Sequence, residues 1–306
     1  MFDTKRTDHE KRGAFRKLLE RSGTIVMPAA YDALSARIIE RVGFEAAFHS
    51  GHGTSVSLLG VSDIGLVCFA EMQSRVYRIA KSIDIPLFAD ADTGYGNALN
   101  LSRTTKEFIW AGASGLFFED QVWPKRCGYM RGKEVIPKAE FVGRARAAVA
   151  ARNEQDRLFT LMARTDAASV NGLADAIERV NLCAEVGVDL GFVHGLETTA
   201  QMKQATKECI VPLMFSMAGI EMGAVPYSLS VQEAEDLGFK IVEFGAATWL
   251  ASAKAMKDVL ISLKETGSVL SYRASLMDGW GEFGSLVGLE SIRNMEREYL
   301  TPSAEG

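Results

Sequence analysis

Short apolar runs alternate with longer amphipathic stretches along most of the chain. Eight of these runs are predicted to be strands, at residues 24–27, 46–49, 86–89, 115–118, 158–163, 190–193, 211–215 and 240–244. The stretches between them favour helices, at residues 33–41, 70–82, 101–110, 138–152, 173–186, 199–208 and 231–237. Because the strand runs have too little polar alternation to face water on either side, they are typical of a parallel sheet.

Several of the predicted helices end at a glycine just before the next strand, namely at Gly43, Gly112, Gly187 and Gly238. A glycine at this place is typical of a left-handed helix cap that turns the chain back to the sheet. Eight strand–helix units in series predict an α/β fold of the closed (β/α)8 TIM-barrel type. An open doubly wound sheet is the alternative, but the first strand runs into MPAAYDALSA and no GxGxxG follows it.

A long helix over residues 246–264 and further helical pattern at 286–299 follow the eighth strand. A barrel of eight strand–helix units needs only one helix after the last strand. The further helical pattern therefore predicts that residues 267–306 are a C-terminal helical extension. We expect the extension to pack on a neighbouring subunit or over the barrel mouth. Since no change of composition marks a boundary, residues 1–306 are predicted to form a single domain.

Composition narrows the class of protein. Hydrophobic residues make up 47% of the chain, which supports a large buried core, and 34 basic against 39 acidic residues give a net charge of −5. Such a charge disfavours non-specific nucleic-acid binding. No apolar run is long enough for a membrane span, and the N-terminus lacks the apolar stretch of a signal peptide. Four widely spaced cysteines indicate neither a disulfide framework nor a metal knuckle. We therefore expect a cytoplasmic enzyme that binds neither nucleic acid nor membrane.

Acidic side chains follow two neighbouring predicted strands. Asp90 and Asp92 come after the third strand and share side-chain parity, and Glu119 comes after the fourth. Active sites of parallel barrels lie at these strand ends. Three uncompensated carboxylates would raise one another's pKa, whereas a divalent cation would remove the conflict. The set therefore predicts a Mg²⁺ or Mn²⁺ site, although any one of these acids could instead cap a helix or pair with a cation.

A long, cationic loop over residues 123–133 follows the acidic end of the fourth strand. It holds Lys125, Arg126, Arg131 and Lys133 and no acid. Such a loop can close as a lid over an anionic substrate. Cys127 lies among these charges, so its thiol pKa is predicted to be lowered and its role to be functional. Glycines on either side of His52 and Tyr95 suggest either anion-binding backbone or, more simply, tight turns.

These stretches together resemble the isocitrate lyase/phosphoenolpyruvate mutase superfamily over residues 12–265. The matching motifs are SGHG at 50–53, DADTGYG at 90–96, EDQ at 119–121, KRCG at 125–128 and ARTD at 163–166. The loop cysteine is similar to that of the carbon–carbon lyase branch, which includes methylisocitrate lyases, 2,3-dimethylmalate lyases and petal-death-type enzymes. The resemblance implies a Mg²⁺-dependent barrel acting on α-keto or α-hydroxy carboxylates. It also implies a homotetramer with C-terminal helices swapped between subunits.

The resemblance also implies roles for individual residues. The metal would be held by Asp92, Asp90, Asp63 and Glu119. The catalytic group would be Cys127 as general acid, with Arg126, Lys125, Gly128 and Arg164. The substrate would be bound at Ser50, Gly51, His52, Tyr129, His194 and Ser216. The chain departs from the lyases at the last three of these and at Phe48, positions that line the part of the pocket for the variable end of the substrate.

The expected reaction is cleavage of a 2-hydroxy dicarboxylate, such as a substituted malate or a 2-methylisocitrate-like acid, to an α-keto acid and a second carboxylic acid. The base that removes the hydroxyl proton stays open between His194, Tyr95 and a water on the metal. Hydrolysis or decarboxylation of oxaloacetate is the alternative within the same superfamily. A non-catalytic, metabolite-binding barrel is the alternative from another class, and the acidic set argues against it.

Overall fold

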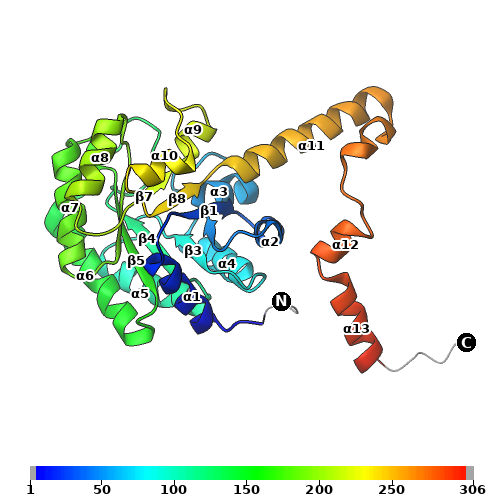
Figure 1. The fold of residues 1–306 in the computed structure, drawn as a ribbon, viewed down its shortest axis with the longest axis horizontal. Helices are drawn as coiled ribbons and strands as arrows, with labels where there is room; N and C mark the ends of the chain where they lie inside the picture. The colour runs from blue at the N-terminus through cyan, green and yellow to red at the C-terminus, as the bar shows by residue number, and fades with distance from the viewer. Residues whose placement is uncertain (1–4, 301–306) are drawn as a thin grey trace, which may run out of the picture.

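A computed structural model describes residues 5–300, and its centre is a barrel of parallel strands (Figure 1). Residues 1–4 and 301–306 lie outside the described part, and the latter are the last six residues of the predicted extension. The strands are β1 (Ile25–Ala30), β2 (Ala47–His49), β3 (Leu87–Asp90), β4 (Gly115–Glu119), β5 (Thr160–Thr165), β6 (Leu190–Val193), β7 (Met214–Ser216) and β8 (Ile241–Phe244). They are hydrogen-bonded in the order β6-β5-β4-β3-β2-β1-β8-β7. The predicted α/β barrel is confirmed.

Each strand is hydrogen-bonded to the next in the order given, from β6 to β7. The pairing of β7 with β6, which would close the barrel, is weaker. β6 and β7 are joined by an isolated parallel bridge between Gly191 and Leu213. By comparison, five residue pairs register β4 with β5, from Gly115↔Thr160 to Glu119↔Arg164. The β6–β7 seam is therefore the least tightly paired part of the barrel wall.

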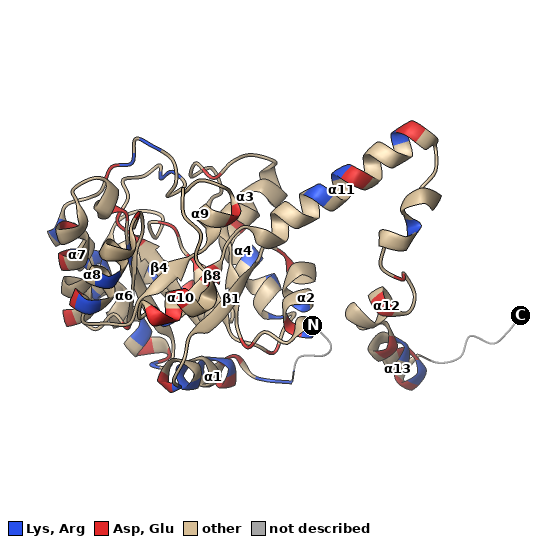
Figure 2. Cartoon of the chain, turned by 45° about the horizontal axis from the view of Figure 1, so that its top comes forward, with Lys and Arg blue, Asp and Glu red and all other residues tan. Residues whose placement is uncertain are grey.

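The chain forms helices around the barrel and, after β8, further helices that extend beyond it (Figure 1). They are α1 (Asp8–Glu20), α2 (Ala33–Val42), α3 (Gly51–Leu59), α4 (Phe69–Ala80), α5 (Ala98–Trp110), α6 (Lys138–Gln155), α7 (Leu173–Glu185), α8 (Thr199–Glu208), α9 (Ala218–Glu221), α10 (Val231–Asp236), α11 (Ala247–Thr266), α12 (Glu282–Leu286) and α13 (Leu289–Tyr299). Two 3₁₀ turns, η1 (Ala167–Ser169) and η2 (Leu270–Ser275), complete the set. All four predicted glycine caps have positive φ, between 94° and 105°. Figure 2 shows both signs of charge mixed on the outer helices.

The barrel interior is filled by large side chains from successive strands, among them Phe88, Phe117 and Met162. Phe15 of α1 closes one end, because its ring is buried and its centroid lies 5.5 Å from that of Phe88. The sequence analysis did not predict α1, which begins at a capping box formed by Thr7 and Glu10.

The C-terminal elements project away from the barrel as an arm formed by residues 247–300 (Figure 1). The long helix α11 buries none of its residues, and Trp280 is 81% exposed. Two arginines of α2 hold the far part of the arm, since Arg37 and Arg41 donate to the carbonyls of Leu286 and Ser285. Among residues 5–300, no helix combines the length and apolarity required to cross a bilayer.

Gly115 is expected to be essential for close strand packing. A Cβ at this position would lie 2.5 Å from Cε2 of Phe88 and 2.6 Å from the carbonyl oxygen of Thr160. Because neither neighbour has room to move, Gly115→Ala should lower the free energy of unfolding by about 2–3 kcal/mol, measured by denaturant titration. Gly143 of α6 is the matched control, since a Cβ there meets nothing within 4 Å. Gly143→Ala should stabilise the protein by about 0.5–1 kcal/mol, and equal effects of the two changes would contradict the packing argument.

Candidate active site

A cavity of about 70 Å³, here called the inner chamber, lies among the C-terminal ends of the strands. The predicted site residues that line it are Ser50, His52, Asp63, Asp90, Cys127, Gly128, Tyr129, Arg164, His194 and Ser216. Gly51 lies beside Asp90, to which its N–H donates. Asp92, Glu119 and Lys125 are buried and connected to the lining by ion pairs. Fourteen of the fifteen predicted residues are thus brought to one place, and Arg126 is the exception.

Lys125 stands at the centre of the acidic group. Its ammonium nitrogen lies 2.6 Å from Oδ2 of Asp63 and 2.6 Å from Oδ1 of Asp92. Burial raises the pKa of Asp90 and of Asp92, and Lys125 counteracts that effect. The pKa of Lys125 itself is raised well above its usual value, because the surrounding carboxylates outweigh its burial. Lys125 is therefore a buried counter-ion of the acids.

Arg164 connects the acidic group to the next strands. Its Nη1 lies 3.1 Å from Oε2 of Glu119, and its Nε lies 3.1 Å from Oδ2 of Asp166. The guanidinium also lies 5.4 Å from the ring centroids of both Phe117 and Phe192. A planar cation held in this way by two carboxylates and two rings is rigidly oriented.

Asp90 and Asp92 were predicted to lie on one strand with their side chains on the same side, and the structure places only Asp90 on the strand. β3 ends at Asp90, and Asp92 lies in the following turn with a φ of 49°. The carboxylate of Asp90 accepts the N–H of Asp92 at 2.9 Å and that of Gly51 at 3.2 Å. The parity argument was therefore wrong for Asp92, although the turn still brings the residue to the cluster. Left-handed backbone at a non-glycine residue costs energy and is typical of functional sites.

The N–H groups near the start of α3 are used by the protein itself. The N–H of Ser50 donates to the carbonyl of Ala30 at 3.0 Å, and that of Gly51 donates to Asp90. These two N–H groups are thus already paired within the protein, which favours the simpler of the two interpretations of the glycines beside His52 over an anion-binding backbone. The glycines of the SGHG motif form the first turn of a helix capped by Ser50, whose Oγ accepts from the N–H of Gly53.

The acidic group has carboxylate oxygens of the kind that bind a hard divalent cation. Oε1 of Glu119 is buried without a hydrogen bond or an ion pair, and burial raises the pKa of Glu119. Four carboxylates, of Asp63, Asp90, Asp92 and Glu119, face the two cations Lys125 and Arg164. The charge balance therefore leaves room for a cation. Within residues 5–300, no three acids, histidines or cysteines surround one point as metal ligands, and the Lys125 ammonium lies between Asp63 and Asp92.

Cys127 lies on the loop between β4 and α6 and is held over the chamber by Asp63. Its N–H donates to the carbonyl of Asp63 at 3.0 Å, and its sulfur lies 3.9 Å from Nδ1 of His52. Burial raises the pKa of the Cys127 thiol and outweighs the nearby cations. The prediction of a lowered pKa was wrong, because that prediction counted the loop charges without the burial. A thiol that keeps its proton is a proton donor.

The loop cations have different environments. The side chain of Arg126 is exposed and lines neither the inner chamber nor the cavity beside it. In contrast, Lys133 donates to the carbonyl of Gly128 and lies 3.0 Å from Asp166. Lys133 and Asp166 were not predicted as site residues, although Lys133 was named among the loop cations and Asp166 ends the ARTD motif. Together they anchor the loop on β5.

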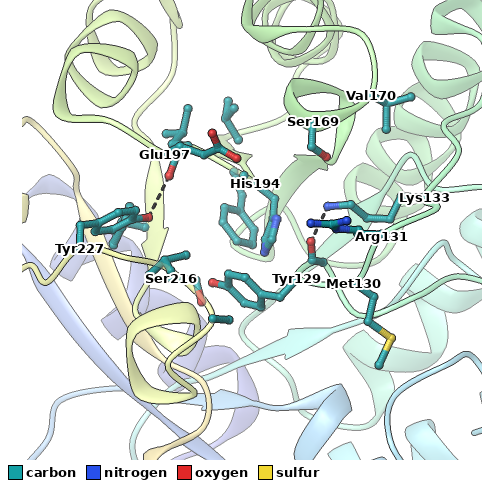
Figure 3. Close-up of a pocket in the computed structure, with 18 of the residues that line it drawn as sticks. Tyr129, Met130, Arg131, Lys133, Ser169, Val170, His194, Glu197, Ser216 and Tyr227 are labelled. Atoms are coloured by element: carbon teal, nitrogen blue, oxygen red, sulfur yellow. Dashed lines mark hydrogen bonds between the residues drawn. The ribbon is translucent and has the colours of Figure 1, made fainter.

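Tyr129 and His194 separate the inner chamber from a larger cavity of about 660 Å³, the outer cavity. Figure 3 shows both rings in its wall, with the phenol hydroxyl turned toward Ser216. The ring centroids lie 4.6 Å apart in an edge-to-face arrangement. Burial lowers the pKa of His194 to about 3, so the imidazole is neutral. Of the two side chains considered as base, His194 lines the chamber and Tyr95 does not.

Among the chamber residues that the sequence did not predict are Trp249 and Glu243. The indole of Trp249 lies beside His52, with ring centroids 5.0 Å apart. Glu243 is buried in β8, and burial raises its pKa to about 8. The signal for Glu243 was a lone acid within the apolar run 240–244.

The chain is similar to known proteins over almost its whole length. A family model described as phosphoenolpyruvate phosphomutase matches residues 15–264. The chain is 42% identical to the chloroplastic carboxyvinyl-carboxyphosphonate phosphorylmutase of Arabidopsis thaliana, covering 93% of this chain and 84% of that one. It is 38% identical to the 2,3-dimethylmalate lyase of Eubacterium barkeri, covering 94% and 97%. An oxaloacetate acetylhydrolase structure with 3,3-difluorooxalacetate superimposes with a TM-score of 0.86 at 32% identity, covering 95% and 96%.

Proposed function

Because the chain belongs to the phosphoenolpyruvate mutase/isocitrate lyase superfamily and is a carbon–carbon lyase of it, we propose that it cleaves a 2-hydroxy dicarboxylate with the help of Mg²⁺. The products are an α-keto acid and a second carboxylic acid, and a substituted malate is the substrate class. The observation that carries the proposal is the position of the Cys127 thiol in the lining of the chamber, beside a buried group of acids and cations. Arg164, Ser50 and Ser216 line the chamber, and these polar side chains suit the carboxylates of a small diacid.

The acidic group orients the keto-acid half of the substrate. Asp92, Asp90, Asp63 and Glu119 would hold the cation, for which Lys125 gives up its place between Asp63 and Asp92. When bound, Mg²⁺ supplies positive charge to the oxygens of that half (Mn²⁺ is an alternative). Arg164, which is already fixed by Glu119 and Asp166, contributes its remaining N–H groups to the carboxylate.

Cleavage begins when a base removes the hydroxyl proton. The electron pair of the O–H bond forms the new carbonyl, the C–C bond breaks, and its electrons pass to the enediolate of the leaving acid. Lys125 and the N–H of Gly128 stabilise that negative charge. Cys127 then gives its proton to the enediolate carbon, and the resulting thiolate regains a proton from the base. Arg126 takes part only if the loop moves, because its side chain is exposed.

Metal removal should abolish turnover. Treatment with EDTA is expected to lower the rate by about 100-fold or more, and added Mg²⁺ or Mn²⁺ should restore it, because the buried carboxylates then regain their counter-charge. The measurement is initial rate at fixed substrate concentration, with Ca²⁺-buffered EDTA as a control for chelator effects. Full turnover in EDTA would contradict the metal proposal.

The proposed reaction is tested by a substrate panel. Substituted malates, 2-methylisocitrate and 2-keto dicarboxylates are incubated with the Mg²⁺-loaded protein, and pyruvate, glyoxylate and oxalate are measured. Pyruvate or another α-keto acid from a substituted malate would support the proposal. Absence of carbon–carbon cleavage across the panel would overturn it.

Hydrolysis of oxaloacetate is the second candidate, and the likeness to the acetylhydrolase structure favours it. The same panel separates the two, since hydrolysis gives oxalate and acetate and decarboxylation gives pyruvate and carbon dioxide. Oxalate as the main product would assign the chain to the hydrolases.

We also propose a homotetramer in which the arm of residues 247–300 packs on neighbouring subunits. Its exposed apolar side chains include Met256, Leu260, Ile261, Leu270 and Trp280. Burying them would remove a large apolar surface from water. Light scattering should give four chain masses, and a monomeric mass would contradict this. A cytoplasmic location is proposed as well, to be tested by fractionation of the source cells.

A further inference from the structure

Lys133, at the C-terminal end of the loop over residues 123–133, is held between two partners. Its ammonium donates to the carbonyl of Gly128, a bond drawn in Figure 3, and to Oδ1 of Asp166 at 3.0 Å. The side chain of Lys133 is 6% exposed, whereas Arg131 of the same loop is an exposed residue. Burial of an ammonium is unfavourable unless its donors are used, and these two bonds account for it.

The backbone of Gly128 lies directly against two residues of the inner chamber. A Cβ at Gly128 would lie 2.5 Å from Nε2 of His194 and 2.8 Å from Nη2 of Arg164. A side chain here would overlap both groups, so this close approach requires glycine. The bond from Lys133 to the Gly128 carbonyl holds the backbone in this place. Because Cys127 precedes Gly128, the same bond restrains the segment that carries the thiol.

Asp166 connects this segment of the loop to Arg164. Its Oδ2 accepts from Nε of Arg164 at 3.1 Å, and its Oδ1 accepts from the Lys133 ammonium. Asp166 is fully buried, and its N–H donates to Oδ1 of Asp120 at 2.9 Å, which fixes it at the end of β5. The loop cation and the cation proposed to bind substrate therefore share one immobile carboxylate.

Other attachments of the loop lie in its first half. The side chain of Gln121 exchanges two hydrogen bonds of 3.0 Å with the backbone of Arg126. The N–H of Cys127 donates to the carbonyl of Asp63 at 3.0 Å. Loss of the Lys133 bonds should therefore release the second half of the loop and leave the first half in place.

We propose that Lys133 is a positioning residue, whose bonds to Gly128 and Asp166 hold the loop backbone against Arg164. In this position the N–H of Gly128 and the thiol of Cys127 face the substrate. Lys133 lines the outer cavity and not the inner chamber, so it acts through the loop. The inference rests on the proposed function, which gives that N–H and that thiol their roles in the reaction.

The kinetic test compares two substitutions of Lys133 with the best substrate of the panel. Lys133→Met removes both bonds at similar side-chain length and should lower kcat by about 10- to 100-fold. KM should stay within about 3-fold, because Arg164 keeps its pairing with Asp166 and Glu119. Lys133→Arg keeps the charge and the donors and should return kcat to within about 5-fold of the parent.

A second measurement needs no turnover. Alkylation of Cys127 by iodoacetamide is followed by peptide mass spectrometry in the Cys68→Ser background, which removes the exposed thiol and leaves Cys183 and Cys209 buried. K133M should increase the alkylation rate by about 10-fold or more, because the released loop uncovers the thiol. Loss of a nearby cation alone would raise the thiol pKa and slow alkylation, so a faster rate reports exposure. K133R should keep the parent rate.

Lys138→Met is the matched control, since its ammonium pairs with Asp175 and Glu178 outside the lining of both cavities. It should leave kcat and the alkylation rate within about 2-fold of the parent. If K133M does not fold, Lys133→Gln replaces it, and the same changes are expected because the cation is lost.

An unchanged kcat, or an unchanged alkylation rate of Cys127, in the neutral variant would overturn the positioning role. A loss of kcat as large in K133R as in K133M would overturn it too. Lack of cleavage by the parent protein would instead overturn the proposed function, and the alkylation rates would still show whether Lys133 holds the loop.

Discussion

Replacing Cys127 with serine is expected to lower kcat by about three orders of magnitude. The thiol is the buried proton donor beside the chamber, and its pKa is raised, so it holds a proton that it can give to carbon. A serine hydroxyl has nearly the same shape but is a far weaker acid, so the protonation step slows while binding persists. The measurement is the steady-state rate with the substrate identified by the panel.

Cys68→Ser is the matched control for this change. Cys68 is exposed at the start of α4, outside the lining of the chamber, so its loss should leave the rate unchanged. Calorimetry should show that the Cys127→Ser protein still binds Mg²⁺ with the parent affinity. Near-native turnover of this variant would remove Cys127 from the chemistry.

Replacing Arg164 with lysine should lower kcat/KM by about 100-fold or more. The guanidinium pairs with Glu119 and Asp166 at once and lies against two aromatic rings. A lysine keeps the charge but has no planar guanidinium, so it cannot pair with Glu119 and Asp166 at the same time. The substrate carboxylate also loses the paired N–H donors of the guanidinium. We expect a lower melting temperature as well as a lower rate.

Arg152→Lys separates the two effects. Arg152 is also largely buried and lies 2.8 Å from Asp189, which precedes β6 and so is at the opposite end of the barrel from the chamber. This control should lower the melting temperature while kcat/KM stays near the parent value. Equal loss of activity in both variants would mean that Arg164 acts through stability alone.

The barrel was predictable because its signal is periodic. Apolar runs separated by amphipathic stretches determine a parallel sheet covered on both faces, and the four glycines with positive φ mark helix ends that turn toward it. Strand bounds were less certain. The seventh strand was expected at residues 211–215 and is Met214–Ser216, since Leu213 before it forms only an isolated bridge, to Gly191.

Two helices lacked the usual periodic signal. In α1 the charged residues Lys11 and Arg12 are buried, because Lys11 donates to the carbonyls of Ala80 and Ile83 and Arg12 donates to that of Ala113. A search by polarity treats such residues as solvent-exposed. The first turn of α3 contains two glycines, which usually indicate a turn. The capping residues Thr7 and Ser50 were the available signals.

The composition of the site was more predictable than its electrostatics. Motifs after the strands located the acids, Arg164 and the Cys127 loop, because strand ends of a parallel barrel meet. Whether a cation serves a substrate or a neighbouring acid depends on burial, which the sequence does not contain. Lys125 is a buried counter-ion and Arg126 is exposed, although they are adjacent in the chain.

The weak seam between β6 and β7 has a consequence for how such an enzyme can diversify. The acids, Arg164 and their strands belong to the densely paired half of the wall, whereas His194 and Ser216 follow the two strands that a single bridge joins. Mutations that widen or reshape the seam disturb few ladder bonds. Selection can therefore change which dicarboxylate the pocket accepts without altering the acids and Arg164 on the other strands.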